Sequence, residues 1–224
     1  KKTMIGIMDF FGNASSVHFE GRQARSVIEQ AREKISVSIG ADPENLFFTS
    51  GATEGATLLL KNCKIPCATV EHPCVKYWCQ DSLEVSNSGE IKITDSTKNT
   101  MQLANSETGI LQKIPKGLYM SDIVQGVGKV KFSFKESGIR SAIISAHKFG
   151  GPQGIGAVIT EDNFEIKPQI FGGGQEKGRR AGTESLVSIG GFGAAIEFAK
   201  LQLDDGIWEK VEELRDLLED ELAN

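Results

Sequence analysis

Apolar residues recur at helical spacing near the start of the chain and again at its end. One such face, between residues 21 and 40, collects Ala24, Val27, Ile28, Ala31, Ile35 and Ile39. This spacing predicts an amphipathic helix that ends at Gly40. Residues 183–203 and 207–224 also have helical patterns, and Gly206 is the best candidate for a break between them.

Short apolar runs that end in polar or glycine-rich segments alternate with these helical stretches. They predict strands at 46–49, within 67–73, across 89–95, at the start of 100–109, in 117–122, and on both sides of the glycine loop in 141–160. Further helices are expected from about Ala52 and from Pro73 through Trp78. Strands interleaved with helices predict an α/β fold with a mainly parallel sheet flanked by helices.

Composition and charge narrow the class of function. The chain has 224 residues, of which 39% are hydrophobic and 25% charged, as in ordinary soluble proteins. The net charge of −5 argues against nucleic acid or an anionic membrane as a partner, because both favour a basic surface. No apolar run is long enough to predict a bilayer span, and the first residues do not resemble a signal peptide. We therefore expect a cytoplasmic protein.

The four cysteines do not have the spacing of a disulfide framework. They are Cys63, Cys67, Cys74 and Cys79, and we interpret them as reduced thiols. A zinc site with His72 is a weaker alternative, and no metal is expected.

Three polar clusters follow predicted strands, where open parallel sheets bind ligands. In TSGATEG, a glycine turn brings Ala52 and Thr53 to a helix start that suits a phosphate, although such a turn can also only cap a helix. Asp122, in a mostly apolar run, needs either a cationic ring nitrogen or an arginine as its partner. Lys148 follows an apolar strand; if held in apolar surroundings it can form a Schiff base, and otherwise it is a solvent-exposed lysine. Together the three clusters indicate pyridoxal phosphate (PLP) chemistry.

Several segments resemble the cysteine desulfurase family of the class V aminotransferase superfamily. They are FGNASSVH (11–18), FTSGATE (48–54), EHPCV (71–75), NSETG (105–109), SDIVQGVGK (121–129), SAHKFGGPQGIGAV (145–158) and GGGQEKGRRAGT (172–183). The resemblance implies an aspartate-aminotransferase-like large domain over residues 1–205 that binds PLP. It also implies a homodimer that takes sulfur from cysteine, for example for iron–sulfur cluster assembly, with a sulfur-acceptor or scaffold protein as a further partner.

The resemblance also implies a role for each matching residue. Lys148 would carry the cofactor, Asp122 would keep the ring nitrogen protonated, and His72 would stack on the ring and transfer protons. Gln125 would contact the ring hydroxyl. The phosphate would be held by Ala52, Thr53, Ser145 and His147, together with Thr183 from the neighbouring subunit.

Three departures from the family pattern affect the expected activity. Ser106 stands where an asparagine is common, which weakens or removes one cofactor contact. The usual N-terminal strand is not recognisable in residues 1–10. Residues 206–224 are expected to lead toward a small domain, whose catalytic cysteine and substrate-binding arginine are not recognisable here. We therefore expect little desulfurase activity from this chain alone.

Two alternatives to a cysteine desulfurase remain. One is another class V enzyme, such as a selenocysteine lyase or a small-amino-acid aminotransferase. The other is a non-catalytic PLP-binding or interaction subunit that completes its site with another polypeptide.

Overall fold

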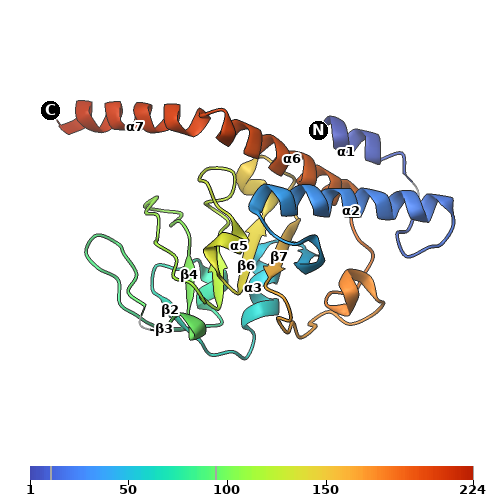
Figure 1. Cartoon of the computed structure of the whole chain (residues 1–224), viewed down its shortest axis with the longest axis horizontal. Coiled ribbons are helices and arrows are strands. Elements are labelled where there is room, and N and C mark those ends of the chain that lie inside the picture. Colours follow the sequence, from blue (N-terminus) through green and yellow to red (C-terminus); the bar gives the residue numbers. More distant parts are fainter. Residues whose placement is uncertain (11, 94, 224) are drawn as a thin grey trace.

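The computed structural model describes residues 1–10, 12–93 and 95–223 (Figure 1). Phe11, Thr94 and Asn224 lie outside the described residues. They are the first residue of the FGNASSVH segment, one residue of the expected strand 89–95, and the last residue of the expected terminal helix.

The expected helices form with small shifts at their ends, and two short helices that the pattern did not predict form at Lys2–Ile7 and Phe134–Ser137. The helices are α1 (Lys2–Ile7), α2 (Phe19–Ile39), α3 (Ala52–Leu60), α4 (Pro73–Lys76), α5 (Phe134–Ser137), α6 (Leu186–Asp204) and α7 (Ile207–Ala223). Gly40 ends α2 in the left-handed conformation at φ 62°, as glycine at this position predicts. The α4 helix stops at Lys76, short of the expected Trp78.

The central sheet has the order β1-β7-β6-β5-β4. The strands are β1 (Leu46–Thr49), β2 (Pro66–Ala68), β3 (Gln80–Leu83), β4 (Thr100–Gln102), β5 (Met120–Asp122), β6 (Ser141–Ser145) and β7 (Gly156–Thr160). Both β1 and β6 pair antiparallel with β7, whereas β6, β5 and β4 pair in parallel. Four strands therefore run in one direction and β7 alone is reversed, which confirms the expected mainly parallel sheet.

The strand expected across 89–95 is wrong. Ile91 forms only an isolated bridge with Val85, and its backbone N–H donates to the side chain of Gln112 at 3.0 Å. The alternating pattern of this segment therefore belongs to a loop that is tied by a side chain. The second sheet is instead a parallel pair of β2 and β3.

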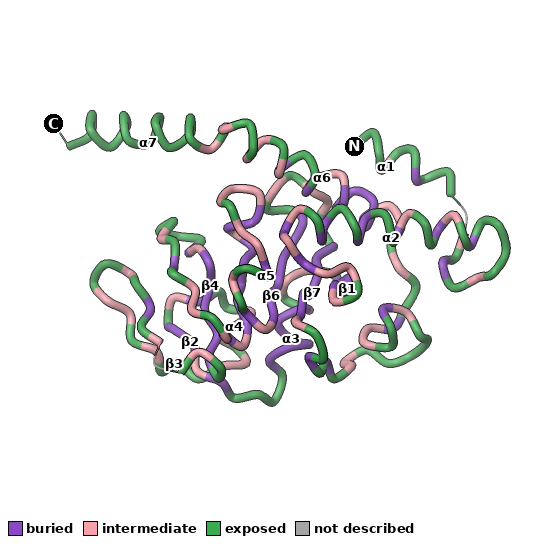
Figure 2. Tube along the Cα trace, in the orientation of Figure 1, coloured by how far each residue is buried: buried purple, intermediate pink, exposed green. Residues whose placement is uncertain are grey.

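Helices cover both faces of the central sheet (Figures 1 and 2). Phe48 and Ile144 face α2 and α6, whereas their strand neighbours Phe47 and Ile143 face α3. Successive side chains of a strand point to opposite faces, so a strand buried on both sides needs a continuous apolar run. This requirement explains why β1 and β6 have no polar alternation.

The α2 and α6 helices pack closely because α6 contains glycine at the crossing. A side chain on Gly193 would place its Cβ 2.9 Å from the Cα of Ala31. By length and apolar composition α6 could also cross a membrane, although no such run was expected from the sequence. Its residues Ile189, Phe192 and Ile196 are instead buried in the protein core, as in an ordinary core helix.

Gly206 separates α6 from α7, as predicted, and adopts φ 72°. Beyond it, α7 extends away from the sheet, and none of its described residues is buried (Figure 2). An apolar stripe remains exposed along this helix, at Val211, Leu214, Leu217, Leu218 and Leu222. The division into a domain of residues 1–205 and a following segment stays a prediction.

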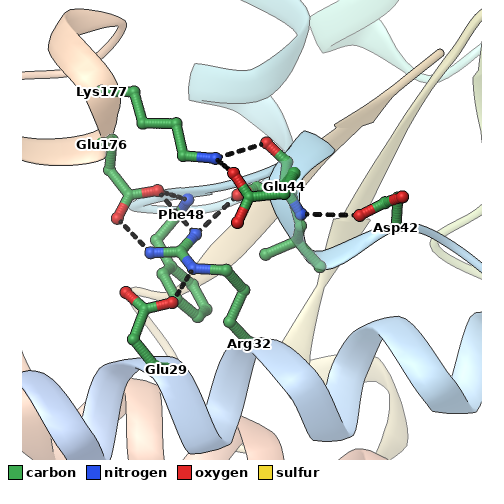
Figure 3. Close-up of polar contacts among 8 residues, drawn as sticks. Glu29, Arg32, Asp42, Glu44, Phe48, Glu176 and Lys177 are labelled. Atoms are coloured by element: carbon green, nitrogen blue, oxygen red, sulfur yellow. Dashed lines mark hydrogen bonds and ion pairs between the residues drawn. The ribbon is translucent and has the colours of Figure 1, made fainter. Parts of the chain in front are cut away.

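A buried ion pair ties α2 to the glycine-rich segment near residue 176 (Figure 3). Arg32 donates to both carboxylate oxygens of Glu176, at 2.9 and 3.1 Å, and to the carbonyl of Leu46. Glu176 also accepts from the backbone N–H of Phe48 at 2.7 Å. A helix, a strand and a loop that are distant in sequence are therefore fixed at one point.

Replacing Arg32 by alanine should lower the free energy of unfolding by about 3–5 kcal/mol, because Glu176 would remain buried without a cation. Urea denaturation measures the loss. Lys34→Ala on the same helix is the control, since its pair with Glu197 is exposed and should contribute only about 0–1 kcal/mol. Equal losses in the two variants would contradict the structural role given to the Arg32–Glu176 ion pair.

Candidate functional site

A cavity of about 630 Å³ opens at the carboxyl ends of the central strands. Nine of the ten residues predicted for the site line it: Ala52, Thr53, His72, Ser106, Asp122, Gln125, Ser145, His147 and Lys148. They come from segments that follow β1, β2, β4, β5 and β6. Thr183 does not line this cavity.

The start of α3 forms one wall of the cavity. The first helical bond runs from the N–H of Gly55 to the carbonyl of Gly51, so the N–H groups of Ala52 and Thr53 have no partner within the helix. Gly156 makes room for this turn, since a Cβ there would lie 2.7 Å from the Cα of Gly51. The arrangement offers donors to an anion at the positive end of a helix.

Ser145 and His147 stand opposite this helix start. The Ser145 hydroxyl lies 2.9 Å from Nδ1 of His147. Burial, followed by the nearby charge of Lys148, lowers the pKa of His147. His147 is therefore neutral near pH 7, and its ring can offer a hydrogen bond.

Asp122 ends β5 and is almost fully buried. One carboxylate oxygen accepts from the backbone N–H of Val124 at 3.0 Å. Burial raises the pKa of Asp122, while the Val124 bond and the charges of His72 and Lys148 act against that rise. No arginine bonds to it among the residues that the structure describes. The structural alternative raised by the sequence, an arginine partner, is therefore not what the fold provides.

Lys148 lies on a short 3₁₀ turn, Ala146–Phe149, directly after β6. Its side chain is exposed, so the idea that it is held in apolar surroundings is wrong. The reason is local: after the buried strand the chain turns outward, and the lysine projects into an open cavity. Its position beside Asp122 and the anion-binding wall is what distinguishes it from an ordinary surface lysine.

His72 caps the start of α4 through its ring. Its Nδ1 accepts from the backbone N–H of Cys74 at 3.2 Å and lies 3.0 Å from the Cys74 Sγ. In the neutral ring, an accepting Nδ1 requires the proton to be on Nε2. Cys74, interpreted from the sequence as a reduced thiol, also lines the cavity.

Gln125 and Ser106 each have a partner that fixes part of the side chain. The ammonium of Lys129 donates to Gln125 Oε1 at 2.8 Å, which leaves the Gln125 amide nitrogen as its free donor. The Ser106 hydroxyl donates to Glu107 at 2.7 Å. Serine is short and its hydroxyl is already bonded, which agrees with the expected loss of one cofactor contact at this position. That loss stays a prediction.

Sequence reasoning missed Gln102, Glu107 and Gln153, which also line the cavity. Gln102 had a usable signal, since it is a polar residue between the apolar Met101 and Leu103 at the end of β4. Glu107 and Gln153 lie in polar loops, where nothing in the residue pattern separates a site residue from a solvated one.

The start of α3, which forms one wall of the cavity, is linked to the segment that carries Thr183. Glu54 of α3 pairs with Arg180 at 2.9 Å and accepts from the backbone N–H of Ser50 at 2.7 Å. Burial opposes ionisation of Glu54, but the bonds to Arg180 and Ser50 outweigh it and lower the pKa of this carboxyl. The pair therefore stabilises the fold above the ordinary pKa of a glutamate, and this contribution is lost as the pH falls.

Glu54→Gln should lower the free energy of unfolding by about 1.5–3 kcal/mol at neutral pH, because charge-assisted bonds are lost. The difference from the unmodified protein should be smaller at about pH 3 than at pH 7, because protonation of Glu54 removes the same charge. Urea denaturation at both pH values measures it. Glu44→Gln, which removes the exposed pair with Lys177, is the control and should change stability little. A loss of the same size at both pH values would disprove the ionic account.

Comparison with known proteins places this geometry in a family. The sequence profile of the class-V aminotransferases matches residues 2–224. A relative named cysteine desulfurase IscS, from Dictyoglomus turgidum, is 36% identical over 92% of this chain and 61% of its own length. A cysteine desulfurase of a Nostoc species is 34% identical over 96% of this chain and 62% of its own length. The chain thus spans about three fifths of these relatives.

Solved structures agree with the sequence relatives. A NifS-like protein superposes with a TM-score of 0.91 at 31% identity, covering 100% of this chain and 71% of the other. A NifS-like protein of Rickettsia africae gives a TM-score of 0.87 at 33% identity, covering 99% and 70%. A family profile that spans nearly the whole chain, together with this shared fold, shows that the chain belongs to the class-V aminotransferase family.

Proposed function

We propose that this chain binds PLP in the cavity at the strand ends and forms the cofactor-binding part of a cysteine desulfurase. One observation carries the proposal: Lys148, Asp122 and the anion-binding start of α3 line the same cavity. The residues fit the cofactor, because a buried carboxyl without an arginine suits a cationic ring nitrogen. The close approach of Gly156 to Gly51 shapes the wall that would take the phosphate.

Each residue has a distinct part in this proposal. Bound PLP supplies an electron sink for bond cleavage at the α-carbon of an amino acid. Lys148 attaches the cofactor and moves protons with its amino group, while Asp122 holds a proton on the ring nitrogen. His72 carries its proton on Nε2, the atom from which it can donate. Gln125 offers its amide nitrogen to the ring hydroxyl.

The proposed substrate is cysteine, with alanine and enzyme-bound sulfur as products. Support comes from relatives named cysteine desulfurases and from a solved relative described as SspA in complex with cysteine, at 29% identity. Cys74 is the cysteine that lines the cavity within the described residues, but burial, followed by the charge of Asp122, raises its pKa to about 12. A thiol that stays protonated is a poor nucleophile, so we propose that another thiol takes the sulfur.

We also propose a cytoplasmic homodimer that delivers sulfur to an acceptor or scaffold protein of iron–sulfur cluster assembly. Thr183 lies on an exposed segment outside this chain's own cavity, where it could reach the phosphate site of a partner subunit. Cys63, Cys74 and Cys79 are not paired in disulfides, which suits a reducing compartment. Light scattering of the purified protein, with and without PLP, tests the dimer.

Lys148 should be the attachment point of PLP. Borohydride treatment of the loaded protein, followed by peptide mapping, should leave a pyridoxyl group on Lys148. Lys148→Ala should abolish the label, whereas Lys129→Ala, at the nearest lysine behind Gln125, should keep it. A label on any other lysine would show the proposed assignment to be wrong.

Asp122→Ala should weaken PLP retention, because a charge-assisted bond of about 1.5–3 kcal/mol is lost. Equilibrium dialysis of the loaded variant measures retention, and Asp122→Asn separates loss of charge from loss of volume. An unchanged dissociation constant in both variants would count against this role.

A further inference from the structure

Glu71 is a buried acid that the proposed chemistry does not use. It lies three residues beyond the end of β2, and it is 4% exposed. One carboxyl oxygen accepts from the backbone N–H of Gln102 at 2.7 Å. The other oxygen is buried and has no hydrogen-bond partner among the described residues. A buried carboxylate with an unpartnered oxygen is costly, whereas a protonated carboxyl is far less so.

The charge that acts on Glu71 belongs to another buried acid, Asp122. Gln102, which donates to Glu71, pairs directly with Asp122 in the register of β4 and β5. Two carboxylates that share a buried site cannot both ionise cheaply, so one of them keeps a proton. Asp122 is the better anion of the two, because Lys148 contributes positive charge to it.

The other ionisable groups around Glu71 do not supply the missing cation. His72 and Cys74 begin α4, and Cys74 keeps its proton because burial raises its pKa to about 12. Lys76 and Glu107 line a surface cavity together with Glu71, and neither bonds to its unpartnered oxygen. Burial, followed by the charge of Asp122, raises the pKa of Glu71 to about 8.

We propose that Glu71 is a neutral carboxylic acid in the folded protein, and that it positions the end of β4 while the negative charge of the pair stays on Asp122. As a neutral group it still accepts the Gln102 N–H, so the strand end is held without a second charge beside the ring site. The contact with PLP rests on the proposed function, whereas the protonation of Glu71 does not.

The protonation is tested on the cofactor-free protein. Because folding raises the pKa of Glu71, its contribution to stability is complete below its unfolded pKa and is lost as the pH rises toward about 8. Glu71→Gln keeps a neutral side chain, so its unfolding equilibrium constant relative to the unmodified protein should fall at least about tenfold between pH 5 and pH 8.5. Urea denaturation at both pH values gives the ratio.

Glu90→Gln, at an exposed position in the following loop, is the matched control and should show no such change. Infrared spectra of the unmodified protein at neutral pH should contain a protonated-carboxyl stretch that Glu71→Gln lacks. A pH-independent ratio, or the absence of that band, would overturn the proposed neutral acid. The denaturation ratio and the infrared band are both independent of PLP. The neutral acid can therefore be disproved while the Lys148 assignment holds, and the Lys148 assignment can be disproved while the neutral acid holds.

The positioning role is tested by PLP affinity. Glu71→Gln should bind PLP within about threefold of the unmodified protein, while Glu71→Ala, which loses the bond to Gln102, should bind about tenfold more weakly. Absorbance titration of both proteins measures the dissociation constants. Rescue by glutamine distinguishes a hydrogen-bond acceptor from a required charge, and equal affinities in the two variants would remove the positioning role.

Discussion

The common direction of four strands is the constraint on which the site depends. Because β1, β4, β5 and β6 all end at one edge of the sheet, the residues that follow them meet there even though they are far apart in sequence. The strands themselves are buried on both faces and can carry few polar groups. Chemistry is therefore confined to the last residue of a strand, as at Asp122, and to the first residues beyond the strands, where Lys148 and the turn before α3 lie.

Three buried carboxyl groups show how this fold accommodates charge in its interior. Glu176 is balanced by Arg32 and accepts one backbone N–H, from Phe48, so its role is structural. Asp122 has one backbone donor and an open cavity in front of it, which leaves it available to a cationic ligand. Glu71 has one donor and no cation, so a proton is the remaining way to lower its cost.

Most of the fold was predictable because helical spacing and continuous apolar runs were both strong signals in the sequence. Helical spacing identified α2 and α7, and continuous apolar runs identified β1, β6 and β7. Pattern failed where a loop imitates a strand, as at Ile91, which is held by the side chain of Gln112. The placement of Lys148 was expected, but the choice between apolar surroundings and exposure stayed open, because apolar neighbours in sequence say little about which way the chain turns after a strand.

The resemblance to known motifs supplied the residues of the cavity more fully than composition could. Nine of the ten expected residues line it, while Gln102, Glu107 and Gln153 emerged only from the three-dimensional arrangement. Hydrogen-bond partners such as Lys129, which donates to Gln125, could not be predicted either, since nothing in the sequence shows which polar atoms face each other.

The absent side chain of Gly193 limits how this part of the protein can vary. Any larger residue would press on Ala31, and the adjacent residue on the same helix is Arg32. Pushing α2 away from α6 would therefore pull the guanidinium from Glu176 and loosen the segment that carries Arg180. Adding a single methyl group at this helix crossing would thus disturb the wall of the distant cavity. Natural substitutions of Gly193 should therefore be scarce.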